Sequence, residues 1–364
     1  MRRQPMFMVV VALLTFAGPA TALLAEECAE GDTCVVELPG AVCGDGTQMF
    51  MNVTARAGAS RLYVYLQGGG ACWDSVTCAC GWDGNCAGGT AATLTRPPAN
   101  QVRSGWHDPN VSGNPIGADY NIVEIPYCSG DLFMGHKLQK FGGRGHGLRQ
   151  FGYRNISIAL GEVKKRFPSP ESIVLMGSSA GGIGAAFNLH QVRREYPATP
   201  LSLIADSGTP FKAPYVHQDG MDRLVNSWSL RDNIPSDYPL LVPGPMDLSG
   251  IVKYNAKRYP DHNYALISSY DDLTMNSFAI LVGSHYGFFT VHSNINDFAD
   301  HDLGGRQKVF YLTGNRHTFH ELAPAEVVAD DVNLGDWLSS MLDGHGNWTN
   351  QRANPGLAPA LTPQ

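Results

Sequence analysis

The sequence predicts an α/β protein built on a mostly parallel sheet that helices flank on both faces. Two observations predict this class. Several short segments are nearly continuous apolar runs, as expected for strands covered on both faces, and helical segments alternate with them along the chain. A chain of 364 residues can bury one large core of this kind. We therefore expect a signal peptide at residues 1–22, a single domain at 23–343 and a flexible tail at 344–364.

The strands and helices are expected in a regular order. Strands are predicted at Arg61–Leu66, Tyr120–Tyr127, Ser172–Met176, Leu201–Ala205, Ala265–Ser269 and Lys308–Leu312. Helices are predicted at Asn155–Arg166, Ala185–Glu195 and Asp331–Leu342. Two stretches do not show this alternation of strands and helices. Residues 71–111 are rich in Cys, Gly and Trp and predict a disulfide-pinned loop over the strand ends, and residues 206–263 predict a lid or cap insertion.

The N-terminus has the pattern of an export signal. Arg2 and Arg3 form a basic start, Phe7–Phe16 is apolar, and Ala20–Ala22 is an A-x-A cleavage pattern, with cleavage after Ala25 as the alternative. The apolar run is shorter than a membrane span requires. We expect a secreted or periplasmic protein with no stable membrane span once the signal is removed.

The cysteines agree with an oxidising compartment. All eight lie within the first 128 residues, an even number after an export signal. The alternative is a zinc cluster at Cys72, Cys78, Cys80 and Cys86, but their spacing lacks a C-x-x-C pair. A net charge of −7 without a basic stripe argues against a nucleic-acid partner. We expect no metal and no cofactor.

The most informative motif is Gly177-Ser178-Ser179-Ala180-Gly181, which has the form G-x-S-x-G. An apolar strand precedes it and a helical segment follows it, the setting that a nucleophile elbow requires. Glycines on either side leave room for a sharp turn with the serine at its apex. The motif therefore predicts Ser179 as a nucleophile.

A serine hydroxyl needs a histidine base, and the base needs a carboxylate to hold it. In this class of sheet the acid and then the histidine follow the serine, on loops after later strands. Asp271 follows one predicted strand and His317 follows the next, so we predict them as acid and base. The neighbouring Asp272 is an alternative acid, and His320 is the alternative base.

Asp206, which ends the strand after the nucleophile helix, is a further alternative acid, although a structural or substrate-side role fits it better. The glycine run after the first core strand predicts the oxyanion hole. Gly69 and Gly70 would supply backbone N–H groups there, and Ala180 would supply another beside the nucleophile. The run does not match a phosphate-binding loop.

Five segments resemble, in order, motifs of the pectin acetylesterase and Notum carboxylesterase family. They are Leu66–Trp73, Ile125–Asp131, Gly177–Gly182, Ala205–Gly208 and Tyr270–Asp271. The resemblance implies an α/β-hydrolase fold and cleavage of carboxylic esters by Ser179, Asp271 and His317, with oxyanion donors at Gly69, Gly70 and Ala180. Gln67 and Ala71 depart from the family, which usually has Glu at the first position and, in plant members, Trp at the second.

The resemblance implies a serine carboxylesterase, for which the expected substrate is an O-acetylated polysaccharide such as pectin. Trp73, Trp82 and Trp106 are candidates for stacking on sugar rings, or for packing beneath the disulfide loops. One alternative is a Notum-like esterase that removes a longer acyl chain from a protein or lipid. Another is a carbohydrate-binding protein on an inactive hydrolase scaffold.

Overall fold

The computed structural model describes residues 29–79, 92–99, 105–140, 147–232, 248–284, 286–344, 346 and 348–354. The predicted signal peptide, Trp82 and residues 355–364 of the predicted tail lie outside these ranges. So do Cys28, Cys80 and Cys86.

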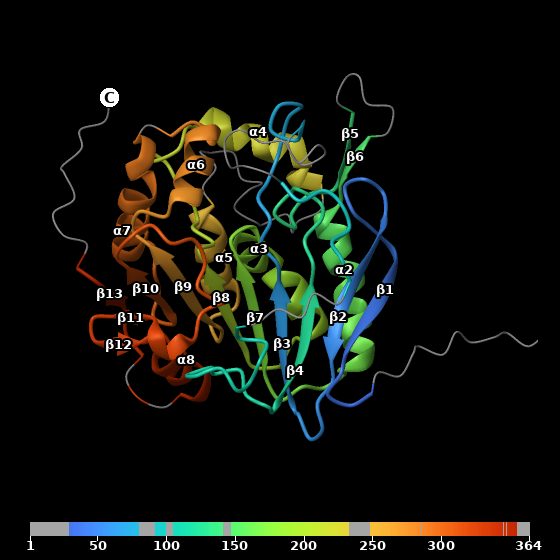
Figure 1. Ribbon diagram of the computed structural model, residues 1–364. Coiled ribbons are helices and arrows are strands. Elements are labelled where there is room, and N and C mark those ends of the chain that lie inside the picture. The colour runs from blue at the N-terminus through green and yellow to red at the C-terminus, as the bar shows by residue number, and fades with distance from the viewer. Residues whose placement is uncertain are drawn as a thin grey trace, which may run out of the picture.

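A central sheet of nine strands has the order β1-β2-β4-β3-β7-β8-β9-β10-β13 (Figure 1). Strands β1 and β2 are antiparallel to their neighbours, whereas the pairs from β4 to β13 are parallel. The strands are β1 Thr33–Val42, β2 Gln48–Thr54, β3 Arg61–Leu66, β4 Tyr120–Ile125, β7 Ile173–Ser178, β8 Leu201–Asp206, β9 Asn263–Ser269, β10 Gln307–Leu312 and β13 Gln351–Arg352. Two small hairpins pair β5 Lys137–Gln139 with β6 Leu148–Gln150, and β11 Val328–Ala329 with β12 Val332–Asn333.

Seven α-helices accompany the sheet in the described part of the chain. They are α2 Gly152–Arg166, α3 Ala180–Glu195, α4 Gln218–Trp228, α5 Ser249–Arg258, α6 Leu273–Val282, α7 Thr290–His301 and α8 Leu334–Asp343. Short 3-10 turns lie at Leu230–Asp232, Gly287–Phe289 and Pro324–Glu326. No helix within the described ranges combines the length and the apolar composition that crossing a bilayer demands.

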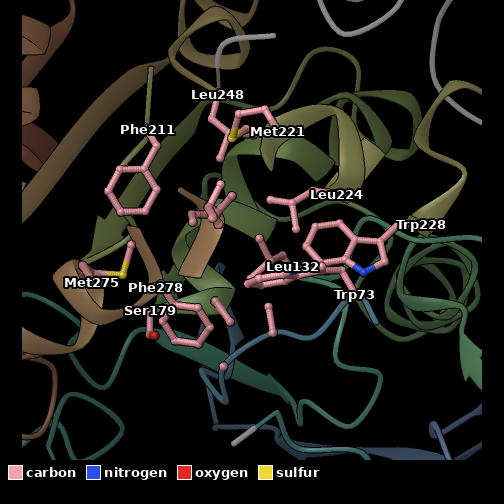
Figure 2. Close-up of a pocket in the computed structure, with 15 residues that line it drawn as sticks. Trp73, Leu132, Ser179, Phe211, Met221, Leu224, Trp228, Leu248, Met275 and Phe278 are labelled. Atoms are coloured by element: carbon pink, nitrogen blue, oxygen red, sulfur yellow. The ribbon is translucent and has the colours of Figure 1, made fainter. Parts of the chain in front are cut away.

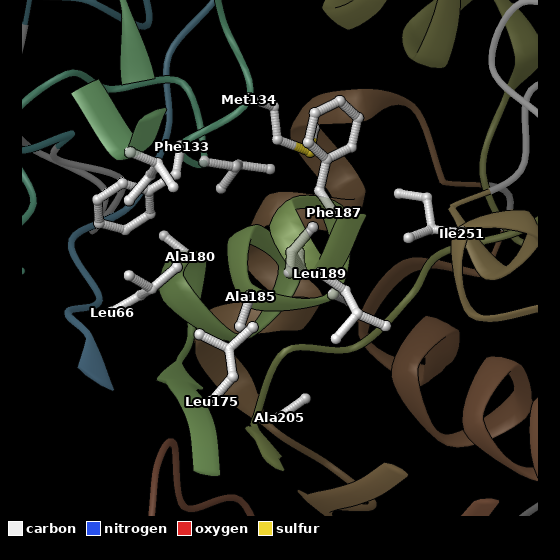
Figure 3. Packing of buried hydrophobic residues seen from close by; sticks show 14 of the residues in the cluster. Leu66, Phe133, Met134, Leu175, Ala180, Ala185, Phe187, Leu189, Ala205 and Ile251 are labelled. Carbon is white, nitrogen blue, oxygen red and sulfur yellow. The ribbon is translucent and has the colours of Figure 1, made fainter. Parts of the chain in front are cut away.

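The alternation of side chains along the strands divides the core into two layers. Leu62 and Val64 of β3 join one apolar cluster with residues of α2, α3, α5 and α7, whereas Tyr63 and Tyr65 join a second cluster with α8. Figure 3 shows part of the first cluster, where Ala185 of α3 lies close to β7. Because successive strand residues point to opposite faces, helices are needed on both sides of the sheet.

The predicted α/β class is confirmed, and each of the six predicted strands corresponds to a strand of the central sheet. The sequence analysis missed the antiparallel strands β1 and β2 and the helices α6 and α7. It also placed Gln351–Arg352 in a flexible tail, whereas these residues form β13 beside β10. Within the predicted lid, α4 and α5 are described, and residues 233–247 lie outside the described ranges.

Two disulfides lie in the described ranges. Cys43, just after β1, is bonded to Cys128, just after β4, and Cys72 is bonded to Cys78. The second bond uses two cysteines of the alternative zinc cluster, so that cluster cannot form as proposed. Among the described residues, no group of three or more His, Cys, Asp or Glu side chains is arranged to hold a metal ion.

Candidate active site

Ser179 lies at a sharp turn between β7 and α3. Its backbone has φ 53° and ψ −121°, in the positive-φ region that non-glycine residues rarely adopt. A Cβ on Gly177 would lie 2.0 Å from the carbonyl oxygen of Gly181, and a Cβ on Gly181 would lie 2.0 Å from that of Leu66. Only glycine therefore fits at either position, and the turn holds the Ser179 side chain at the end of the sheet.

His317 follows β10, and its ring contacts a buried carboxylate. Its Nδ1 lies 2.8 Å from Oδ2 of Asp272, whose side chain is fully buried. In the tautomer whose Nδ1–H is donated to this carboxylate, Nε2 is the nitrogen that can accept a proton. His317 and Ser179 line the same polar pocket. Among the described residues no hydrogen bond joins the two, and such contacts often tighten only when substrate binds.

The predicted acid, Asp271, does not lie beside His317. Its side chain is 51% exposed, and its carboxylate lies 3.5 Å from Nδ1 of His292. Asp272 instead caps the N-terminus of α6, where its Oδ1 accepts a hydrogen bond from the backbone of Met275. The capping position turns Asp272 inward and its neighbour outward. An Asp before a helix is a recognisable N-cap signal, but α6 itself was not predicted.

The alternative base, His320, is buried and has a partner at each ring nitrogen. Its Nδ1 lies 3.1 Å from Oδ2 of Asp206, and its Nε2 lies 2.9 Å from the hydroxyl of Tyr65. Its ring therefore lacks the free nitrogen that His317 has.

Asp206 is fully buried and accepts backbone hydrogen bonds from Phe319 and His320. Its carboxylate thus holds the loop that carries both histidines, which is the structural one of the two roles expected for Asp206, and its burial argues against the substrate-side role. Nearby, the hydroxyl of Ser207 accepts a hydrogen bond from the backbone of Thr318.

The glycine run after β3 forms one wall of the polar pocket, where Gly68, Gly69 and Gly70 lie next to Ser178 and Ser179. Gly70 has φ 72°, and a Cβ on Gly69 would lie 2.6 Å from the ring of Tyr127. Among the hydrogen bonds of the described residues, none is donated by the backbone N–H of Gly69, Gly70 or Ala180. These three amides are therefore the candidate donors to an oxyanion at the serine.

Ser179 also lines a second pocket, which is apolar (Figure 2). Ser179 is the one residue with a hydroxyl or charged side chain among the described residues that line it. Helix α4 contributes Met221, Leu224 and Trp228, and α6 contributes Met275, Phe278 and Val282. The remaining described residues of the wall are Gly70, Ala71, Trp73, Leu132, Ala180, Ile183, Phe211 and Leu248. An apolar group attached to the reacting carbonyl would find its complement here.

The disulfide Cys72–Cys78 is attached to this pocket wall. The carbonyl of Cys72 accepts hydrogen bonds from Nε1 of Trp228 at 2.9 Å and from Nε2 of Gln150 at 2.8 Å. Trp73 lines the pocket and is 6% exposed. Trp106 is buried and donates its Nε1–H to the carbonyl of Leu322. Neither indole presents the open face that stacking on a sugar ring requires.

A sequence profile described as Pectinacetylesterase matches residues 28–236, which is more than half of the chain. The chain belongs to the pectinacetylesterase family. The matched part includes the glycine run and Ser179 and ends before Asp271, Asp272 and His317. Family membership therefore leaves the acid and the base to be assigned from geometry.

Relatives of this pectinacetylesterase family member include palmitoleoyl-protein carboxylesterases named NOTUM. The protein from Homo sapiens is 28% identical over 195 residues, which cover 50% of this chain and 37% of that protein. The protein from Schmidtea mediterranea is 37% identical over 83 residues, or 22% of this chain and 15% of that protein. The chain thus matches well under two thirds of the length of these relatives.

Among solved structures, the Wnt deacylase Notum from Drosophila has a similar fold, with a TM-score of 0.64 and 19% sequence identity. The similarity covers 85% of this chain and 93% of that one. The predicted family and the predicted α/β-hydrolase fold are confirmed. The predicted class, a carboxylic ester hydrolase, agrees with the family and with the names of these relatives.

Proposed function

We propose that the protein is a serine carboxylesterase in which Ser179, His317 and Asp272 form the catalytic triad. Ser179 Oγ attacks the ester carbonyl, and Nε2 of His317 takes the hydroxyl proton and passes it to the departing alcohol. Asp272 holds the imidazole in the required tautomer. The N–H groups of Gly69, Gly70 and Ala180 stabilise the oxyanion, and water then cleaves the acyl-enzyme with His317 as the base.

The observation that carries this proposal is the buried Asp272–His317 pair, whose histidine shares a pocket with a serine at a glycine-flanked turn. A binding protein on an inactive scaffold would not need an imidazole held with Nε2 free beside that serine. The intact set of groups therefore supports an enzyme.

For the acyl group, the apolar pocket favours a chain of several carbons over acetyl. Each buried methylene contributes about 0.8 kcal/mol, or about fourfold in the specificity constant. An acetyl group is too short to fill a pocket whose walls extend to Met221, Leu224 and Trp228 of α4. The buried positions of Trp73 and Trp106 also weaken the case for a polysaccharide platform. The Notum-like alternative is thus favoured over pectin deacetylation, the substrate that the family description suggests.

The test is a panel of p-nitrophenyl esters from acetyl to palmitoyl, assayed with the wild type and with Ser179→Ala. We expect kcat/KM to rise about fourfold per methylene until the pocket is filled, and Ser179→Ala to abolish turnover. Retained turnover in Ser179→Ala would refute the proposed mechanism. An optimum at acetyl would instead leave the mechanism standing and favour the acetylated substrate.

A pocket-filling variant sharpens the acyl assignment. Leu224→Trp adds bulk to the α4 wall and should lower the rate on octanoyl esters at least tenfold while changing the acetyl rate little. Leu138→Trp is the matched control, because Leu138 is 45% exposed and lies outside the pocket. Equal losses on short and long esters in Leu224→Trp would contradict the assignment.

A further inference from the structure

A chain of buried hydrogen bonds leads from Asp206 to Ser178, the residue just before the nucleophile. Oδ2 of Asp206 lies 3.1 Å from Nδ1 of His320, and Nε2 of His320 lies 2.9 Å from the hydroxyl of Tyr65. That hydroxyl lies 2.6 Å from Oγ of Ser178. All four side chains belong to residues at most 4% exposed. The triad does not use this chain.

The direction of each proton in the chain can be assigned. The Asp206 carboxylate faces N–H donors from the backbone of Phe319 and His320 as well as the imidazole, so it accepts. In the tautomer that donates Nδ1–H to this carboxylate, Nε2 of His320 is the acceptor. Tyr65 must donate to Nε2, which leaves its oxygen as the acceptor for the Ser178 hydroxyl proton. Ser178 thus has no proton to offer elsewhere, only lone pairs.

Ser178 lines the same pocket as the nucleophile and the proposed base. It lines the polar pocket together with Ser179, His317, His320 and the glycine run. Gly68 keeps this position open, because a Cβ there would lie 3.3 Å from the Ser178 Oγ and 3.0 Å from the Ser179 Cβ. The apolar pocket takes the acyl side, so the polar pocket is left for the leaving alcohol.

We propose that Ser178 Oγ is an acceptor-only site that selects a leaving alcohol with its own hydrogen-bond donor close to the ester, such as a vicinal hydroxyl. The proposal rests on the proposed esterase function and extends it to the leaving group. Ser178 is a specificity-determining residue here, and Tyr65, which accepts its proton, is a positioning residue.

The test compares 2-hydroxyethyl and 2-methoxyethyl esters of one acyl chain, which differ in whether the alcohol can donate. In the wild type we expect kcat/KM to favour the hydroxyethyl ester about fivefold to tenfold. Ser178→Ala should bring this ratio close to one. Tyr65→Phe should do so as well, although Ser178 is intact, because the freed hydroxyl proton can be donated to the methoxy oxygen.

The Tyr65→Phe result distinguishes the proposed role from a structural one. A packing defect would lower the rates on both esters and leave their ratio unchanged. Thermal unfolding of both variants checks that they are folded. If Tyr65→Phe does not fold, the comparison of the two esters in Ser178→Ala still tests the proposal. A wild-type ratio near one, or a ratio unchanged in Ser178→Ala, would overturn the inference. Failure of the wild type to cleave either ester would instead count against the esterase proposal.

Discussion

Two Asp–His pairs lie at the same end of the sheet, and their histidines are three residues apart in the chain. Asp272 and His317 form the first pair, and Asp206 and His320 form the second. Both carboxylates are fully buried and both hold a histidine by Nδ1. The pairs differ at the other nitrogen, because Nε2 of His320 is bound to Tyr65, whereas the His317 side chain is 20% exposed and lines the pocket.

The comparison teaches that an Asp–His pair does not by itself identify a catalytic base. What distinguishes the two is whether the second ring nitrogen has a partner already. The first pair is suited to proton transfer and the second to holding the loop that carries both histidines. The predictions below separate these roles.

The largest expected effect is on the first pair. Asp272→Asn should lower kcat about 10³–10⁴-fold, because an amide can hold the imidazole in the wrong tautomer. Asn is as good an N-cap as Asp, so α6 should remain capped and the fold intact. Steady-state kinetics with a short ester measure kcat, and a circular dichroism spectrum checks that the fold is intact.

Asp271→Asn is the matched control for that substitution, because Asp271 is adjacent and half-exposed. Its carboxylate is half-exposed to solvent and lies outside the Asp272–His317 pair, so we expect less than a twofold change in kcat. A large loss in Asp271→Asn together with an active Asp272→Asn would restore Asp271 as the acid and reverse the assignment drawn from the geometry.

The next effect concerns the stability that the second pair provides. The Asp206 carboxylate accepts hydrogen bonds from N–H groups of Phe319 and His320. In Asp206→Asn, an amide NH₂ replaces one carboxylate oxygen and would place a donor against at least one of these N–H donors. A buried mismatch of this kind should lower the free energy of unfolding by about 2 kcal/mol. Urea denaturation measures the change, and Asp272→Asn serves as the comparison. If Asp206→Asn were as stable as the wild type, the anchoring role would be wrong.

The smallest effect comes from a third buried histidine, which lies in helix α3. His190 of α3 bonds the carbonyl of Phe187 and the hydroxyl of Tyr153, and burial lowers its pKa from 6.5 to about 4. The unfolded chain then binds more protons at this site than the folded protein, so stability falls as the pH drops below 6.5.

This histidine should remove about 1 kcal/mol of stability between pH 7 and pH 5.5. His190→Gln should reduce the pH dependence of unfolding in urea by that amount, because glutamine does not titrate. Identical slopes in the two proteins would mean that His190 does not carry the effect.

The core of the fold was predictable because its signal is local. The apolar runs of β3, β7, β8 and β10 are visible one by one, and the glycine-flanked Ser179 marks its own turn. Helix α6 was missed because Leu273–Val282 is apolar on most of its surface, with Leu273, Ile280 and Leu281 exposed, so no one-sided stripe reveals it.

The choice between Asp271 and Asp272 depended on that missed helix. Adjacent carboxylates in a sequence are equivalent until the backbone turns one of them inward, and here the N-cap of α6 does so. The role of Asp206 was hidden for a related reason. Its partners, Phe319 and His320, are more than a hundred residues away in the chain. No motif in either segment predicts that the two segments are in contact.

The two disulfides mean that the protein must be produced under oxidising conditions. The backbone carbonyl of Cys72, which is bonded to Cys78, accepts a hydrogen bond from Trp228 in the wall of the apolar pocket. The Cys43–Cys128 disulfide joins two residues that are 85 positions apart, and β2, β3 and β4 lie between them. A cytosolic expression host keeps such thiols reduced. Material prepared there would enter the ester assays without either crosslink, so export to the periplasm, or oxidative refolding, is the appropriate route.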